Sequence, residues 1–374
     1  MQSDLSEAIS NEESLFQTAI VPLKFNSGNL ILWLNSKPNS SHFCRPLSLK
    51  YQKETIEVSK HEHNSLLSQI SELRPVPCEV EGKNGKIQLI VDFKVDLTMF
   101  DGKVVNALTD TKSSQCCNIC GAKPSDMNKI ESVIQRDVNL DACDLGLSAL
   151  HCWMRTFEYI IHISYKLTIK KHQARTPEEK YEVAQRKIFL QSEFREKMSL
   201  VVDAPKAVHG NSNDGNTARR AILDLDTFAS ITGVDIDLIR RLKNVLCAVC
   251  SGYHLNIEKF HEYCYDTLLL IVQLYSWYAI PPTVHKLLVH GAQVADRLEL
   301  PIGMYSEEAQ ESQNKIIRNS RLSHTCKISR LNVMKNQYHY MLIRTDPVIS
   351  QISFVKHKSN GGNPLSEEVM ALLL

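Results

Sequence analysis

The 374-residue sequence has no marked excess of charge of either sign, with 43 lysines and arginines against 42 aspartates and glutamates. This balance provides no general attraction to nucleic acids or membranes, so any anion-binding surface must be local. The sequence also lacks a long uninterrupted apolar run. The longest candidate, TLLLIVQLYSWYAI, contains Gln and Ser and is too short to predict a membrane span.

Cysteine is too sparse for a disulfide framework, since only eleven cysteines occur in a chain of this length. The first residues, MQSDLSEAISNEES, are acidic and polar and have neither the basic nor the apolar part of a signal peptide. Together these features predict a soluble protein in a reducing compartment. In such a compartment a Cys-x-x-Cys pair is more often a metal ligand than a disulfide.

The chain length predicts two or three structural lobes rather than one compact domain, and an apolar content of 43% is sufficient for a buried core. Residues 15–23 and 28–34 are expected to pair as a hairpin, and residues 36–50 to form a loop. Residues 57–73 have the periodicity of an amphipathic helix, and residues 86–100 are rich in β-formers. Residues 131–300 are mainly helical in pattern.

This order of elements indicates an α/β protein, in which a mixed sheet is interrupted by a large helical insertion before its last helix. The expected boundaries place a β-rich part at 1–110 and the insertion at 111–300. A further helix with a basic segment follows at 301–345, and a tail at 346–374.

Two pairs of side chains have the spacing of metal ligands. Cys117 and Cys120 lie in CCNICGAK, where the following glycine permits the turn that aims backbone amides at the sulfurs. His285 and His290 can supply two nitrogens to complete a Cys₂His₂ zinc site. The spacing alone leaves open free loop thiols and ordinary helix histidines. A second pair, Cys247 and Cys250, lies in an apolar helical run and is expected to be packed in the core.

Carboxylates form a second group of candidates. Asp101 follows the β-rich run and precedes a glycine, which predicts a place at a strand end beside an open turn. Glu307, Glu308 and Glu311 fall at the start of one helix, where three- and four-residue spacings bring acids to neighbouring faces. Acids in a first helical turn are also common as solvated capping residues. Metal-dependent strand cleavage would need such carboxylates to converge on one site.

Basic residues follow these acids directly. The segment Lys315–Arg330 holds five lysines and arginines and no acid, including Lys315, Arg318 and Arg321. A second group, Arg219 and Arg220, follows NSNDGNT at an expected helix start. Both segments are candidates for phosphate contact, and a solvated helix face is the alternative for each.

Several landmarks occur in one order along the chain. They are SKPNSSHFCRPLSL, MFDGK followed by Cys-x-x-Cys, LHCWMRTFEYIIHISYKL, NSNDGNTARR, TVHKLLVH and PIGMYSEEAQESQNK. In these landmarks the chain resembles the catalytic core of Transib-type DNA transposases and of the related V(D)J recombination-activating recombinase. The resemblance covers residues 36 to 340.

The resemblance implies a ribonuclease-H-like fold with a helical insertion, an Asp-Asp-Glu triad that binds Mg²⁺ or Mn²⁺, and a structural zinc ion. It places the second aspartate at Asp101 and the glutamate at Glu308, with Glu307 as the nearest rival. It assigns zinc to Cys117, Cys120, His285 and His290. The implied reaction is a nick at a terminal inverted repeat, after which the freed 3′-hydroxyl attacks another strand.

The resemblance further implies DNA as partner, a homodimer, a nuclear location and no membrane. The first aspartate of the triad would precede Met1, and Asp4 does not match its motif. We therefore expect this chain to hold two of the three catalytic carboxylates. The alternative is a catalytically inactive, transposon-derived protein that binds DNA or another protein.

Overall fold

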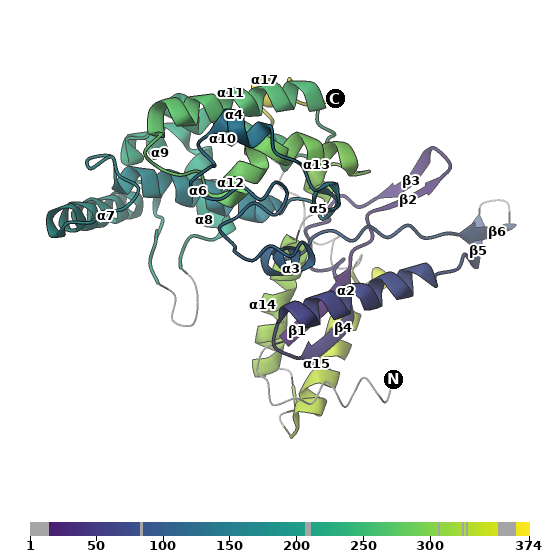
Figure 1. Ribbon diagram of the computed structural model, residues 1–374. Coiled ribbons are helices and arrows are strands. Elements are labelled where there is room, and N and C mark those ends of the chain that lie inside the picture. The colour runs from purple at the N-terminus through teal and green to yellow at the C-terminus, as the bar shows by residue number, and fades with distance from the viewer. Residues whose placement is uncertain are drawn as a thin grey trace.

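The computed structural model describes residues 15–82, 85–205, 211–305, 307–323, 325–326, 328–350 and 364–374. These residues form a mixed α/β arrangement of many helices and small antiparallel sheets. Figure 1 shows a block of helices, a smaller group of strands and helices beside it, and two β-hairpins that project from one side. Asp4 lies outside the described residues.

Helices occupy most of the chain from residue 130 to residue 297, as the periodic apolar residues predict. The bounds are α4 (Ile130–Ile134), α5 (Leu140–Asp144), α6 (Ala149–Tyr165), α7 (Pro177–Met198), α8 (Gly215–Leu223), α9 (Leu225–Thr232), α10 (Ile236–Val249), α11 (Ile257–Tyr275), α12 (Pro282–His285), η1 (Lys286–His290) and α13 (Gly291–Arg297). The last three run on as one continuous helical stretch.

The centre of the helical block is α6, which buries most of its residues. Phe157 is fully buried, stacks on Phe228 with ring centroids 5.7 Å apart, and meets Phe194 edge-on. Burying a side chain of this size contributes about 1.5–3 kcal/mol. The helix α7 begins at a capping box formed by Thr176 and Glu179. Only Leu190 and Phe194 of α7 are buried, and its first half projects from the block (Figure 1).

The strands pair differently from the prediction. The expected hairpin of residues 15–23 with 28–34 is wrong, because β1 (Leu15–Ile20) pairs with β4 (Arg45–Tyr51). The hairpin is formed instead by β2 (Lys24–Ser27) and β3 (Leu30–Leu34), around a two-residue turn at Gly28 with φ of 56°. The residues between the two expected strands are therefore themselves a strand. The chain turns after them, at Gly28, because glycine permits the tight two-residue turn there.

Two other sequence assignments are corrected. The segment 36–50 is not all loop, because β4 begins at Arg45; Pro46 is tolerated there in a two-stranded sheet with an irregular register. The strands β5 (Val76–Gly82) and β6 (Gly85–Val91) form the second hairpin. Residues 92–101 have no regular structure, so Asp101 does not lie at a strand end but caps the short helix α3 (Gly102–Leu108).

The described strands thus form three separate antiparallel pairs, and a ribonuclease-H-like sheet stays a prediction. The amphipathic helix of residues 57–73 is confirmed as α2 (Ile56–Ser71). Its buried members are polar, Ser59 and Glu62, and Glu62 accepts a 2.7 Å bond from Lys50 of β4. Its leucines remain partly or largely exposed, with Leu67 at 46%.

The chain returns to its first strands near its end. The helices α14 (Glu308–Ser323) and α15 (Arg330–Arg344) pack against β4, where Leu49, Ile317 and Met341 form one small apolar cluster. Tyr51 and Met334 form another. Between α13 and α14, Gly303 passes so close to the helical block that an added Cβ would lie 2.3 Å from the Ser251 carbonyl oxygen. The start of α14 is thereby fixed against the block.

Near the end of the predicted tail lies a short helix, α17 (Glu367–Met370). Its neighbours Leu372 and Leu373 are buried in the core of the helical block, and the Asn256 amide donates to the Leu372 carbonyl at 2.9 Å. Residues 351–363 of the predicted tail lie outside the described part. Within that part, no helix is long and apolar enough to cross a membrane.

Candidate functional site

The four predicted metal ligands lie together. The sulfurs of Cys117 and Cys120 and one nitrogen each of His285 and His290 are all within 4.8 Å of one another. The set joins a loop ahead of α4 to the α12–η1 stretch, which is 165 residues away in sequence. Both histidines and Cys117 are almost fully buried, as a structural metal site requires. This cluster can therefore hold a metal ion.

The cysteine half of the site is a tight turn. Gly121 has φ of 66°, and its amide donates to the Cys117 carbonyl at 2.9 Å. The amides of Ile119 and Cys120 point at the Cys117 sulfur, and that of Ala122 points at the Cys120 sulfur. Amide donors favour the thiolate form that binds metals, so the turn is suited to this chemistry.

The histidine half depends on a π-turn that sequence reasoning missed. In an α-helix, residues five apart lie about 140° apart around the axis. The segment Lys286–His290 is instead a π-helix, whose i→i+5 bonding brings His285 and His290 toward the same face. Their ring centroids are 5.4 Å apart. The five-residue spacing therefore needs this wider turn to present both rings to one ion.

A hydrogen bond on His290 leaves the correct atom of that ring for a metal. The Nδ1 of His290 lies 2.8 Å from the Gln293 Oε1, so it carries the proton and leaves Nε2 as an unpartnered buried acceptor. The Nε2 of His285 lies 3.3 Å from the Cys120 sulfur. Burial lowers the pKa of His285, which keeps that ring neutral. The bond from Cys117 lowers the pKa of Cys120, so this thiol is the first of the pair to ionise.

A second cluster gathers acids from segments far apart in sequence. Asp101 caps α3, Ser148 and His151 begin α6, and the glutamates begin α14. After larger causes, the charge of Asp101 also helps to raise the pKa of both His151 and Glu311. Among the described residues, however, the Cys/His set is the one group of three or more ligands close enough to share an ion.

Glu307 is the most buried of these acids, at 7% exposure. It accepts from the Ser148 hydroxyl, and its Oε1 lies 2.7 Å from the Nδ1 of His151. Ser148 also lies 2.9 Å from that nitrogen and caps the helix at the His151 amide. The ring of His151 is thus fixed by its Nδ1, and the bond to Glu307 raises its pKa. Sequence reasoning did not single out His151, because one histidine carries no spacing signal.

We expect Glu307→Gln to lower the pKa of His151, because the first cause of its raised value is removed. In the native protein this pair stabilises the fold fully below the unfolded-state pKa of histidine, about 6.5, and the gain is lost as pH rises through the raised pKa. The stability difference between the two proteins should therefore be larger at pH 6 than at pH 9. Urea unfolding at both values measures it, and equal differences would contradict the assignment.

Glu308 and Glu311 have different surroundings. Glu308, the glutamate placed by the resemblance, forms an ion pair with Arg219 of α8 and accepts a 3.4 Å bond from Asn39. Glu311 is exposed on one side, and its pKa is raised by partial burial and then by the charge of Glu307. The charge of Asp101 is among the smaller causes of the raised pKa of Glu311, and in the described residues Glu311 has no ion pair like that of Glu308, so Glu311 is also a candidate ligand.

The predicted phosphate contacts lie at different places. Arg219 is engaged by Glu308 and lies 5.8 Å from the Trp153 ring centroid, whereas Arg220 donates to the Met198 carbonyl. Lys315 and Arg318 are exposed on α14. Arg321 lies over the ring of Tyr51 at 5.8 Å. Lys327, a further member of the basic segment, lies outside the described residues.

Two other features lie apart from both clusters. Cys250 accepts from the Trp153 indole at 3.1 Å, and with Cys247 it packs against the core of the helical block.

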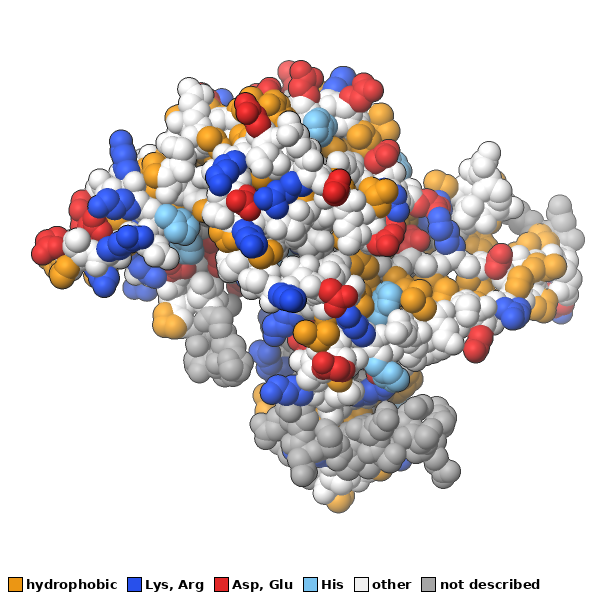
Figure 2. All heavy atoms as spheres, viewed as in Figure 1, with side chains coloured by type: hydrophobic (Ala, Val, Ile, Leu, Met, Phe, Trp, Pro, Cys, Tyr) orange, Lys and Arg blue, Asp and Glu red, His pale blue; other side chains and the backbone are white. Residues whose placement is uncertain are grey.

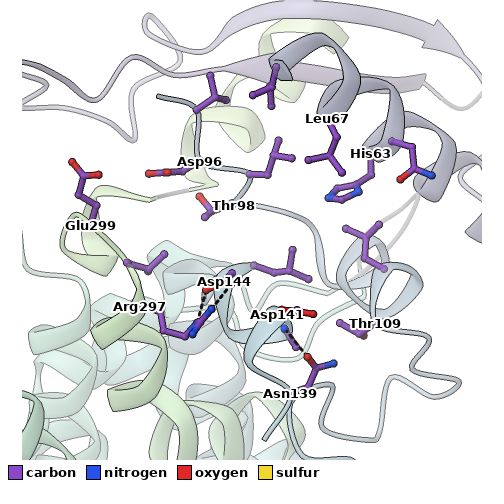
Figure 3. A pocket seen from close by; sticks show the side chains of 18 of the residues that line it. His63, Leu67, Asp96, Thr98, Thr109, Asn139, Asp141, Asp144, Arg297 and Glu299 are labelled. Carbon is purple, nitrogen blue, oxygen red and sulfur yellow. Dashed lines mark hydrogen bonds and ion pairs between the residues drawn. The ribbon is translucent and has the colours of Figure 1, made fainter. Parts of the chain in front are cut away.

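A cavity of about 930 Å³ lies between α2 and the ends of α5 and α13, with His63 and Leu67 on one wall and the Arg297–Asp144 ion pair on the other (Figure 3). None of the predicted site residues lines it.

Comparison with known proteins leaves the site to be interpreted from its own geometry. No family model matches this chain, and no curated protein matches it.

Proposed function

We propose that this chain is the core of a Transib-like DNA transposase, related to the V(D)J recombination-activating recombinase, that cleaves and joins DNA at terminal inverted repeats. The observation that carries the proposal is the contact of Glu307, next to the first residue of α14, with Ser148 and His151 at the start of α6. The charge of Asp101 adds to the electrostatic field at His151 and Glu311. The Cys/His cluster on the adjoining helical stretch supports the proposal. The packing of α14 and α15 on β4 is what a ribonuclease-H-like core with a helical insertion would require.

Zinc is the metal that fits the buried cluster best. Two thiolates and two imidazoles match its ligand preference, and the unpartnered Nε2 of His290 is the atom that a metal would bind. In a tetrahedral zinc site the ligand atoms lie about 3.3–3.8 Å apart, so a small contraction of the observed set is enough. The site would brace the α12–η1 stretch, which leads into the acid-bearing helix α14.

The acid cluster is suited to divalent cations. Asp101 together with Glu308 or Glu311 would hold Mg²⁺ or Mn²⁺, which when bound supplies an activated water and neutralises charge on the phosphate. Arg219, Arg220, Lys315, Arg318 and Arg321 would contact the DNA backbone without reading sequence. His151, fixed through Nδ1, turns its other nitrogen away from Glu307 and can donate to a phosphate oxygen. A homodimer and a nuclear location belong to the same proposal.

One observation favours a second candidate, a DNA- or protein-binding relative without catalytic activity. The acids do not form a group of three ligands within reach of one ion in the described part of the chain. This candidate predicts DNA binding that does not depend on a divalent metal and leads to no strand cleavage.

Duplexes selected from a random library by binding to the protein provide the test. Incubation of end-labelled bound duplex with Mg²⁺ or Mn²⁺ should give nicked and then hairpin-ended products on a denaturing gel, and Ca²⁺ or a chelator should give none. Binding without products in any metal would support the inactive relative. Absence of specific duplexes after selection would contradict both candidates.

A further inference from the structure

The loop of residues 166–176, between α6 and α7, is a basic segment that belongs to neither of the two clusters described above. It contains Lys166, Lys170, Lys171 and Arg175, together with His172, and no acid occurs between Glu158 and Glu178. In a chain of balanced charge this is a local positive surface. Figure 2 shows lysine and arginine side chains, with acidic side chains among them, at the end of the molecule from which α7 projects.

A small cavity lies within this loop. It measures about 320 Å³ and is lined by Lys171, His172, Gln173 and Arg175, so every lining side chain carries N–H donors. The loop lies directly before the N-terminus of the 22-residue helix α7, whose aligned peptide dipoles add positive potential. Such a set of donors fits an oxyanion.

The loop is held in place before any ligand binds. The His172 ring contacts Tyr278 in a tilted arrangement with centroids 4.8 Å apart, and Lys166 donates to the His172 carbonyl at 2.7 Å. The Ala279 amide donates to the Nδ1 of His172 at 3.3 Å, so a neutral ring carries its proton on Nε2. Lys170 adopts φ of 48°, in the left-handed region that non-glycine residues seldom occupy, and its amide donates to the Lys166 carbonyl at 2.8 Å. The donors are therefore pre-organised.

Two carboxylates lie close to the loop, and both are already satisfied. Glu178 bonds to its own backbone amide and to the Thr176 side chain. Glu179 accepts from Lys171 and from the backbone amides of Arg175 and Thr176. It neutralises Lys171 and orders the loop. Within the described residues, the side chains of Lys170 and Arg175 have no ion-pair partner and remain exposed for a ligand.

We propose that the loop 166–176 is a phosphate-binding subsite that holds the backbone of DNA away from the acid cluster. The inference rests on the proposed function, because it takes the ligand to be a phosphodiester. The helix α6 connects the two places: His151 lies in its first turn and Lys166 follows its last residue. Seventeen residues of helix span about 25 Å, so DNA that contacts both places covers roughly seven base pairs.

The test compares the native protein with the double variant Lys170→Ala/Arg175→Ala, using fluorescence anisotropy with a selected 20-base-pair duplex over a range of salt concentrations. The loss of one or two phosphate contacts should weaken binding and reduce the slope of log Kobs against log salt by about 0.9 per contact. The control Lys123→Ala/Lys259→Ala removes two exposed charges elsewhere and should leave the slope unchanged. Circular dichroism establishes that both variants are folded.

The outcomes separate the two proposals. A native slope in the loop variant, with the native protein binding DNA, would overturn the subsite alone. Absence of DNA binding by the native protein would overturn both the subsite and the proposed function. Sodium phosphate is the second probe: a His172 imidazole NMR signal that responds to it as strongly as to duplex would identify a free-phosphate site and overturn the assignment to DNA.

Discussion

Cys117→Ser is expected to remove one bound metal ion per chain and to lower the melting temperature by about 10 °C. A structural metal contributes its binding free energy to folding, and the loss of one buried thiolate should cost about 4 kcal/mol. For a helical unit of this size each kcal/mol corresponds to about 2–4 °C. His290→Ala should have an effect of the same kind, because its Nε2 is the unpartnered atom that faces the cluster.

The neighbouring thiol provides a matched control. Cys116 precedes Cys117 directly but is not part of the cluster, so Cys116→Ser should retain the metal and the native melting temperature. Metal content by mass spectrometry of the intact protein and thermal unfolding by circular dichroism measure both effects. A full complement of metal in Cys117→Ser and His290→Ala would show that the four side chains are not one site.

Asp101→Asn and Glu311→Gln are each expected to lower metal-dependent cleavage of DNA about 10³-fold, which corresponds to about 4 kcal/mol of transition-state stabilisation. In the proposed function Asp101 and Glu311 would hold the divalent cation, so each substitution would remove a charged oxygen ligand of that ion. DNA binding should change by less than about threefold, because these acids do not attract the phosphate backbone. Single-turnover cleavage at saturating protein separates the two effects.

Glu308→Gln is the discriminating variant, because the resemblance assigns the catalytic role to Glu308. Its carboxylate is held by Arg219, so we expect a loss below about tenfold together with a changed salt dependence of DNA binding, as Arg219 is released. A loss of about 10³-fold in Glu308→Gln with little effect in Glu311→Gln would reverse this assignment and restore the one made from sequence.

The helices were predictable because their evidence is local. Nearby residues carry both signals: the apolar period of α6, α10 and α11, and the capping box at Thr176. The structure contains each of these helices. The strand partners were not predictable in this way. A strand pattern shows which residues are extended but not what they pair with, so β1 was assigned to a near neighbour rather than to β4, 30 residues onward.

The sequence by itself determined the chemistry available to this protein: two thiols, two imidazoles, a group of acids on one helix and a local excess of basic residues. These follow from residue identity and spacing, together with the resemblance of the ordered landmarks. Only the tertiary structure decided which of these side chains meet. The burial of Glu307 against His151 and the ion pair of Glu308 with Arg219 depend on contacts between segments far apart in sequence. The π-turn that aligns His285 with His290 is local, but residue spacing does not reveal it. The spacing of residues in the sequence does not reveal the long-range contacts, because they form only when the helical block packs against the start of α14.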